Sequence, residues 1–312
     1  MPHGDVTIVR ACVRDGAGGA SGSPTAVLGE VPLSDERRRR VAVAAGTSHA
    51  VFVSVAAGRA GIPVVSLRFF TAEGELPACG HGTLAALAFA TRGAGSGTHR
   101  VELRTAGRVF EGRSVREGGR VRASFEAGAV ELREPTAAER DLVVPALGVP
   151  AGALGAGLRV ASTGRPRLLV PVHSTAALAG LAPDTGRLRA ACDRLGLLGC
   201  YVHSGPTSTG RRTARMFAPS IGVPEDVANA NSTACLAAHL ADGGDGGGHG
   251  PGHEHRHGQG QGHGYGVELA VDMGDSLGSP STITASARPG SAGPVVRLGG
   301  AVEIADVVRL PL

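Results

Sequence analysis

Two similar segments, one in each half of the chain, constrain the fold more than any other feature. Residues 83–91 are apolar on all sides and residues 233–240 form a second small-residue segment, so both are predicted to be helices buried in a core. The tetrads 83–86 and 235–238 share Leu-Ala-Ala at the same offset, and each follows a loop dense in Gly, Asn or Ser. One such match in each half indicates a duplicated lobe with a central helix.

Short apolar strands are expected around these helices. Strand-like stretches rich in Val and Phe alternate with Gly turns, and surface helices are expected at 34–45, with Ser34 as its N-cap, and at 184–195. The strand-like stretches are 6–13, 26–28, 51–55, 64–70, 101–103, 108–113, 121–125, 167–172, 200–202, 211–217, 267–271, 281–285, 295–298 and 302–304.

A Pro-, Ala- and Gly-rich stretch at 135–157 is the expected boundary between the lobes. We therefore predict an N-terminal lobe of residues 1–135, which strands near the C-terminus help to close. Residues 136–312 form the predicted C-terminal lobe.

Composition and charge exclude several classes of function. The chain has 31 basic residues, all Arg, against 27 acidic residues, and the two signs are interleaved. Trp is absent and aromatic residues make up 3%, so we expect no nucleic-acid partner, which would need a basic face with stacking groups. The dense Arg run at 37–40 is expected to be a solvated helix face. The N-terminal residues do not resemble a signal peptide and no apolar run approaches ~20 residues, so we expect a cytoplasmic protein without a membrane segment.

The spacing of Cys and His predicts no metal centre. The five cysteines are odd in number, widely spaced and without a CxxC pair, which argues against a disulfide framework and a structural zinc site. A Gly-rich stretch at 243–264 contains His249, His253, His255, His257 and His263. It has almost no apolar residues to offset the entropy lost on ordering, so we predict a disordered loop. A metal-binding tract is the alternative, although this His spacing defines no ligand geometry.

The sharpest chemical pattern, at 68–83, runs from a predicted strand through a loop into the first buried helix. A helix N-terminus offers unpaired N–H groups and the positive end of the helix dipole, which favour a carboxylate. Gly80 and Gly82 let a ligand approach the backbone closely. Cys79, just before the helix, is a candidate to take a proton from carbon, with His81 beside it as a donor or acid. A buried structural thiol at a tight turn is the alternative interpretation.

The same arrangement of elements recurs at 215–233. A predicted strand leads through an acidic loop with Asp226 to a helix start at Asn231 and Ser232. Asp226 is either a turn cap or an acid–base group that faces the first loop across a cleft. Two helix N-termini that converge on one cleft would hold a carboxylate between two proton-transfer groups, which suits moving a proton from one carbon, or one face, to another.

Several stretches, in the same order along nearly the whole chain, resemble the PhzF-like isomerases of phenazine biosynthesis, relatives of diaminopimelate epimerase and proline racemase. These stretches are 23–28, 48–53, 68–83, 215–226, 278–281 and 296–300. The phrases Arg-Met-Phe-Ala-Pro…Gly-Val-Pro-Glu-Asp and Glu-Leu-Pro…Gly-His are specific together. The resemblance implies an α+β fold of two pseudo-symmetric lobes, each a curled mixed sheet around a central helix. It also implies a cleft active site for a small-molecule substrate, no cofactor, and relatives that are often homodimers.

The resemblance also assigns residues, and this chain departs from the family at several of them. The family's Asp falls on Asp226 and its active-site His on His81, whereas the Glu of its Ser-Glu-Thr motif is replaced by His49. The family's Thr-Gly-Ser-Ala loop falls on 229–232 and is altered, so the phenazine precursor itself is not the expected substrate. Imidazole titrates nearer to neutral pH than a carboxylate, so His49 is still able to shuttle a proton.

The cysteine that precedes Gly80 and His81 makes this motif more similar to that of proline racemase than to that of a typical PhzF-like protein. Proline racemases carry a second cysteine in the loop of the other lobe, but here that loop has none, and Cys235 lies inside the helix. A symmetric two-thiol racemase is therefore disfavoured.

These features predict a cofactor-independent isomerase that shifts a proton, and with it a double bond, on a small carboxylate. The expected substrate is a cyclic proline-like or dihydropyrrole amino acid of secondary metabolism, as in antibiotic biosynthesis. His49 and Asp226 are the predicted proton carriers, with Cys79 or His81 as the alternative partner. The predicted carboxylate site comprises Gly80, Gly82, Asn231 and Ser232. An amino-acid racemase or epimerase that uses Cys79, and an inactive small-carboxylate binder, are the alternatives.

Overall fold

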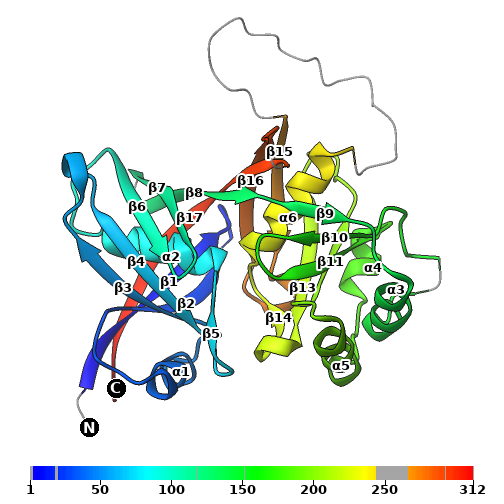
Figure 1. The fold of residues 1–312 in the computed structure, drawn as a ribbon, viewed down its shortest axis with the longest axis horizontal. Helices are drawn as coiled ribbons and strands as arrows, with labels where there is room; N and C mark the ends of the chain where they lie inside the picture. Colours follow the sequence, from blue (N-terminus) through cyan, green and yellow to red (C-terminus); the bar gives the residue numbers. More distant parts are fainter. Residues whose placement is uncertain are drawn as a thin grey trace, which may run out of the picture.

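The computed structural model describes residues 3–17, 20–117, 119–150, 152–243, 266–291 and 293–311. Two lobes of mixed α and β structure lie side by side, each with strands gathered around one helix (Figure 1). The predicted loop at 243–264 lies, apart from Gly243, outside the described residues. In the part of the chain that is described, none of the helices combines the length and apolar character that a bilayer crossing requires.

The strands of the first lobe pair in a closed circuit around α2 (Gly80–Ala90). The order is β1, β2, β3, β4, β6, β7, β8, β17 and back to β1, with β2–β3 and β4–β6 parallel and the other pairs antiparallel. The other elements of this lobe are β1 (His3–Val13), β2 (Ser23–Gly29), α1 (Asp35–Ala44), β3 (Ala50–Ala56), η1 (Arg59–Gly61), β4 (Val64–Phe70), β5 (Glu75–Leu76), β6 (Thr98–Thr105), β7 (Arg108–Glu117) and β8 (Arg120–Ala129).

The second lobe wraps its strands around α6 (Ala230–Ala241) in the same way. Pairings run from β9 through β10, β11, β12, β13, β15 and β16 to β17, and the circuit closes where β8, paired with β17, continues into β9. Its elements are β9 (Glu131–Arg133), α3 (Ala137–Val143), η2 (Pro145–Leu147), β10 (Arg159–Ser162), β11 (Pro166–Val172), α4 (Thr175–Ala179), α5 (Thr185–Leu195), β12 (Cys200–Ser204), β13 (Arg212–Ala218), η3 (Pro219–Ile221), β14 (Val223–Asp226), β15 (Val267–Met273), η4 (Asp275–Leu277), β16 (Ser281–Arg288) and β17 (Val295–Pro311).

Both central helices are buried because their side chains are small and apolar. In α2, every residue from Gly80 to Phe89 is buried, and in α6 the buried set includes Cys235 and the Leu-Ala-Ala that follows it. Each helix packs against the strands of its own circuit, so residues without a polar face find apolar contacts on all sides. The predicted buried helices are confirmed, and each begins three residues earlier than predicted.

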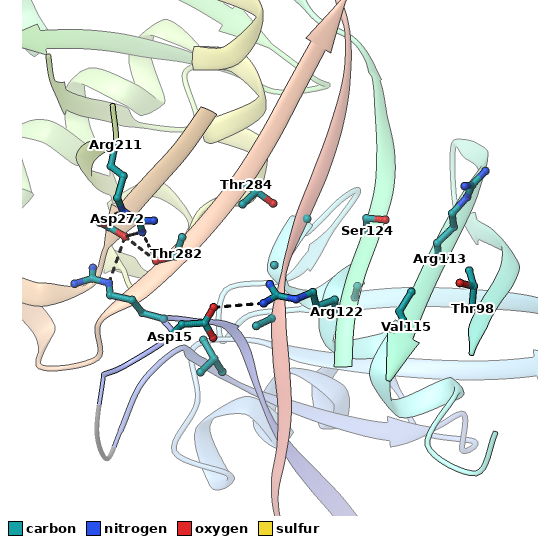
Figure 2. A pocket seen from close by; sticks show the side chains of 16 residues that line it. Asp15, Thr98, Arg113, Val115, Arg122, Ser124, Arg211, Asp272, Thr282 and Thr284 are labelled. Atoms are coloured by element: carbon teal, nitrogen blue, oxygen red, sulfur yellow. Dashed lines mark hydrogen bonds and ion pairs between the residues drawn. The ribbon is translucent and has the colours of Figure 1, made fainter. Parts of the chain in front are cut away.

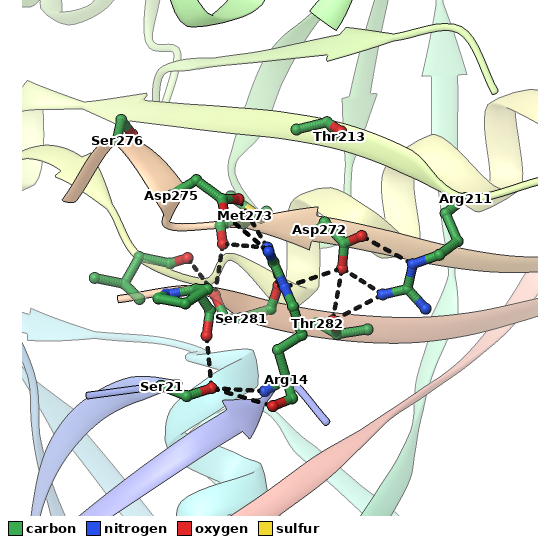
Figure 3. A network of polar contacts seen from close by, with 12 residues as sticks. Arg14, Ser21, Arg211, Thr213, Asp272, Met273, Asp275, Ser276, Ser281 and Thr282 are labelled. Carbon is green, nitrogen blue, oxygen red and sulfur yellow. Dashed lines mark hydrogen bonds and ion pairs between the residues drawn. The ribbon is translucent and has the colours of Figure 1, made fainter. Parts of the chain in front are cut away.

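The two lobes are joined by a polar network at the end of β1 (Figure 3). Arg14 donates to both carboxylate oxygens of Asp275, at 2.8 and 2.7 Å, and to the Met273 carbonyl at 3.1 Å. Ser21 donates to the Pro280 carbonyl at 2.7 Å. These contacts tie the turn after β1 to β15 and β16, which belong to the other lobe.

One expectation needs correction. Arg38 is not part of a solvated face: it is buried, its guanidinium pairs with Glu30, and it lies 4.4 Å from the centroid of the Phe52 ring. The stretch 135–157, predicted as the boundary between the lobes, contains α3, which begins with a Thr136–Glu139 capping box. The Ser34 cap of α1 is confirmed, since its hydroxyl accepts from the Arg37 amide at 3.4 Å.

Candidate active site

The N-termini of α2 and α6 meet at Gly80, from opposite lobes. A Cβ atom on Gly80 would lie 2.7 Å from the Ala230 Cβ and 3.0 Å from the Asn231 Oδ1, closer than packed atoms allow. Only glycine therefore lets the first turns of the two helices touch. The structure brings together the two loops that the sequence singled out, although they are more than a hundred residues apart.

Cys79 and His81 form a buried pair at the start of α2. Cys79 occupies the N-cap position without a side-chain hydrogen bond to the first turn, and its Sγ lies 3.5 Å from His81 Nε2. Burial lowers the pKa of His81, but the adjacent Cys79 and Asp226 outweigh this and raise it to about 9. The His81 ring is therefore an imidazolium at neutral pH.

Asp226 ends β14 and reaches the first lobe through His81. Its Oδ2 accepts from Asn229 Nδ2 at 2.9 Å and lies 4.0 Å from His81 Nδ1. Oδ1 is buried and has no hydrogen-bond partner among the described residues. Burial raises the pKa of the Asp226 carboxyl, and the neighbouring His81 and Asn229 offset part of that increase.

His49 completes the cluster from the residue that precedes β3. Its Nδ1 lies 2.8 Å from the Ser48 Oγ, and its ring stands edge-on to that of His81 with 4.5 Å between centroids. Burial lowers the pKa of His49 well below its ordinary value, and the neighbouring His81 lowers it further. His49 is therefore a neutral imidazole beside a charged one.

A cavity of about 170 Å³ opens onto this cluster between the lobes. Of the predicted residues, it is lined by His49, Cys79, Gly80, His81 and Asn231. The other three, Gly82, Asp226 and Ser232, do not line it.

The backbone amide of Ser232, a residue of the predicted carboxylate site, is not an unpaired donor. Its amide already donates to the Asn229 side chain at 2.9 Å, because Asn229 is the N-cap of α6. The first turn of α2 has no such cap from Cys79, so the two helix N-termini differ in what they offer an anion.

Arg167 is a cavity residue that the sequence analysis missed. It lies on β11, is 2% exposed, and donates to the Ser232 Oγ at 3.2 Å and to the Arg165 carbonyl at 2.8 Å. Its Nε has no hydrogen-bond partner, and no carboxylate of the described residues forms an ion pair with it. A buried guanidinium without a counter-ion is costly, so this position points to an anionic ligand. The sequence feature that could have indicated Arg167 is its position, as an arginine at the start of an otherwise apolar strand.

A larger groove of about 690 Å³ lies elsewhere between the lobes and has a different character (Figure 2). Its arginines are already neutralised: Arg122 pairs with Asp15, and Arg211 pairs with Asp272. None of the predicted site residues lines it. The smaller cavity, with its uncompensated charge and its acid–base groups, is the candidate active site.

Comparison with known proteins supports the relationship inferred from the motifs. The family profile described as phenazine biosynthesis-like protein matches residues 18–285. An uncharacterized isomerase of Deinococcus radiodurans is 32% identical over 225 residues, which cover 70% of each chain. The trans-2,3-dihydro-3-hydroxyanthranilate isomerase of Pseudomonas aeruginosa is 32% identical over 227 residues, 70% of this chain and 74% of that one.

Solved structures share the fold. A phenazine biosynthesis protein of the PhzF family from Bacillus anthracis superposes with a TM-score of 0.78 at 17% identity, over 100% of both chains. A predicted epimerase from Pseudomonas aeruginosa gives 0.77 at 25% identity, over 99% of both. A hydroxyproline epimerase from Agrobacterium vitis, solved with trans-4-hydroxy-L-proline bound, gives 0.60 at 12% identity, over 99% of this chain and 91% of that one. The mixed α+β architecture is thus shared with these solved structures.

Proposed function

Because the chain belongs to the phenazine biosynthesis-like (PhzF) family, we propose that it is an isomerase that moves a proton within a small carboxylate substrate and needs no cofactor to do so. Named relatives are isomerases, which supports the reaction class. The altered residues at 49 and 229–232 point to a substrate other than that of the hydroxyanthranilate isomerase. A cyclic, proline-like or dihydropyrrole amino acid of secondary metabolism fits a cavity of about 170 Å³.

The observation that carries this proposal is the pair of adjacent histidines with opposite pKa shifts. The rings of His49 and His81 lie 4.5 Å apart, with the first neutral and the second charged at neutral pH. Neighbouring titratable groups whose environments separate their pKa values supply a base and an acid at one pH. His49 is the proposed base, and His81 with Cys79 is the proposed acid.

Asp226 acts from behind His81 in this scheme. Its carboxylate faces His81 Nδ1 and favours the imidazolium, so the acid is already protonated when substrate arrives. The predicted role of Asp226 as a direct proton carrier is thereby revised to that of a positioning residue, because it does not line the cavity.

The substrate carboxylate is proposed to bind between the uncapped start of α2 and Arg167. The amides at Gly80 and His81 belong to the first turn of α2, and both residues line the cavity. Arg167 supplies the cation that this carboxylate would neutralise. The reacting carbon is then placed beside the two imidazoles.

The proposed reaction balances in protons and electrons. His49 accepts a proton from a C–H bond, and the electron pair of that bond forms a new double bond to the adjacent carbon. The displaced π electrons take a proton from the His81–Cys79 pair at the far end of the system. Return of one proton from His49 to His81 restores the starting state.

The test measures by NMR whether solvent deuterium enters the substrate. Chelator-treated protein is incubated in deuterated water with each member of a panel of cyclic and unsaturated amino acids. We expect deuterium at one carbon of the correct substrate and a changed ultraviolet spectrum, as a shifted double bond requires. Tight carboxylate binding with no deuterium incorporated by any member of the panel would indicate a binding protein instead.

A racemase that uses Cys79 is the second candidate, favoured by the position of this thiol in the cavity beside His81. In that case the product is a stereoisomer with an unchanged spectrum, and chiral chromatography detects it. Replacement of Cys79 by Ala should then abolish turnover, whereas the double-bond shift retains His49 as its base.

A further inference from the structure

We propose that His49, Cys79 and His81 also form a Zn²⁺ site, with a fourth coordination position open to the cavity. The three side chains come from the residue before β3 and from the start of α2, are all buried, and offer one ligand atom each within 4.8 Å of the others. Two imidazoles and one thiolate are a donor set that zinc favours. The proposal goes beyond the proton shift, and it concerns a metal-bound state in which the same groups serve as ligands.

The distances fit a tetrahedral ion. Typical Zn–S and Zn–N bond lengths place the sulfur and nitrogen ligands about 3.6 Å apart. Cys79 Sγ and His81 Nε2 are 3.5 Å apart, so this pair requires no rearrangement. The ligand atoms of all three residues lie within 4.8 Å of one another, so the His49 ring has to move toward the other two ligands to complete the set.

The far side of each ring carries the outer contacts that metal-binding histidines use. Ser48 Oγ holds His49 Nδ1 at 2.8 Å, which leaves Nε2 as the free ligand atom. His81 Nδ1 faces Asp226 Oδ2 at 4.0 Å, while Nε2 faces the sulfur. A hydrogen bond from the other ring nitrogen to a backbone carbonyl or a carboxylate orients a metal-binding histidine and strengthens its donor atom. His81 has such a hydrogen bond with the backbone of Ala228.

The fourth position decides what such an ion does. His49, Cys79 and His81 line the cavity, so the open position faces the place proposed for the substrate. An ion there occupies the proposed base and acid, and zinc is therefore expected to inhibit the metal-free proton shift. Sites with three protein ligands and one open position are typical of exchangeable or catalytic zinc.

The test is Co²⁺ titration of the full-length, chelator-treated protein, followed by displacement with Zn²⁺. We expect one equivalent that gives a thiolate-to-cobalt charge-transfer band and strong tetrahedral d–d bands. Cys79→Ala should abolish the charge-transfer band, and Cys235→Ala, the matched change of a buried cysteine in α6, should leave it unchanged. The His-rich tract at 249–263 has no cysteine, so Co²⁺ bound there adds equivalents without that band.

A wild-type protein without the charge-transfer band, or a band that persists in Cys79→Ala, overturns the proposal. If Cys79→Ala does not fold, peptide mapping of iodoacetamide labelling on the wild type decides: zinc should protect Cys79, and unchanged labelling refutes the site. The result is separable from the proposed function. A cobalt band with no solvent exchange defeats the isomerase alone, and solvent exchange without a band defeats the metal site alone.

Discussion

Nδ1 of His81, in the first turn of α2, lies 4.0 Å from Oδ2 of Asp226, at the end of β14. The two residues are 145 positions apart and belong to different lobes, so this pair couples the two lobes. Cys79 and the Asp226 carboxylate together raise the pKa of His81, so the pair also contributes to the protonation state of the site.

Asp226→Asn should reduce solvent-deuterium incorporation by about 10- to 100-fold, the scale on which loss of the partner behind a functional histidine lowers activity. The amide keeps the shape of the side chain but removes the charge that favours protonated His81. The measurement is the NMR exchange rate, with Asp193→Asn, an exposed residue of α5, as the control. Equal rates for wild type and Asp226→Asn would remove Asp226 from the site.

Arg167→Met should raise KM for the carboxylate substrate by about 10- to 100-fold, as loss of a charge-assisted hydrogen bond implies. Kcat should change less, because the guanidinium binds the substrate in the ground state and the transition state alike. Stability of the ligand-free protein should stay the same or rise, since a buried charge without a counter-ion is replaced by an apolar side chain.

Steady-state kinetics and thermal unfolding, with and without carboxylate, check this prediction. Arg187→Met, at an exposed position of α5, is the matched control. A large loss of stability together with an unchanged KM would show that Arg167 is structural.

Gly80→Ala should push the first turns of α2 and α6 apart. The new Cβ would meet Ala230 Cβ at 2.7 Å, and overpacking of this kind costs about 1–3 kcal/mol. Gly74→Ala is the control, because a Cβ there meets nothing within 4 Å. Urea unfolding should give a lower midpoint concentration for Gly80→Ala than for Gly74→Ala. Equal midpoints would mean that the helices do not meet as described.

His49→Gln should reduce the loss of stability on acidification. Burial holds the folded-state pKa of His49 well below 6.5, so below about pH 6.5 the unfolded chain takes up a proton that the folded protein does not. The wild type therefore loses stability as pH falls through this range. Urea unfolding between pH 5 and 7, in the presence of chelator, should show a shallower slope for the variant, and parallel slopes would contradict the prediction.

His81→Gln should reduce the loss of stability that occurs as the pH rises above neutral. The folded-state pKa of His81 is about 9 against an ordinary 6.5, so its contribution to stability is fully present below pH 6.5 and is lost as pH rises through 9. That contribution is on the order of a few kcal/mol. Unfolding free energies of the chelator-treated proteins between pH 6.5 and 9.5 test this, and an equally steep decline in the variant would refute the assignment.

The local features of this protein follow from its amino-acid sequence. Small apolar residues without a polar face can only form buried helices, so the Leu-Ala-Ala segments of α2 and α6 marked the centre of each lobe. Glycines, cysteine and histidine at the start of α2 marked the chemistry, because a helix N-terminus attracts anions wherever it is placed.

How these features meet depends on the packing of the whole chain. The distance between His49, Cys79 and His81 depends on β3 and α2 packing in one closed circuit of strands, which no local spacing encodes. The same is true of Arg167, whose burial without a counter-ion depends on the place of β11 beside α6. Burial and neighbouring charge are properties of the packed chain. They give His49 a lowered pKa and His81 a raised one, although the two residues are of the same type.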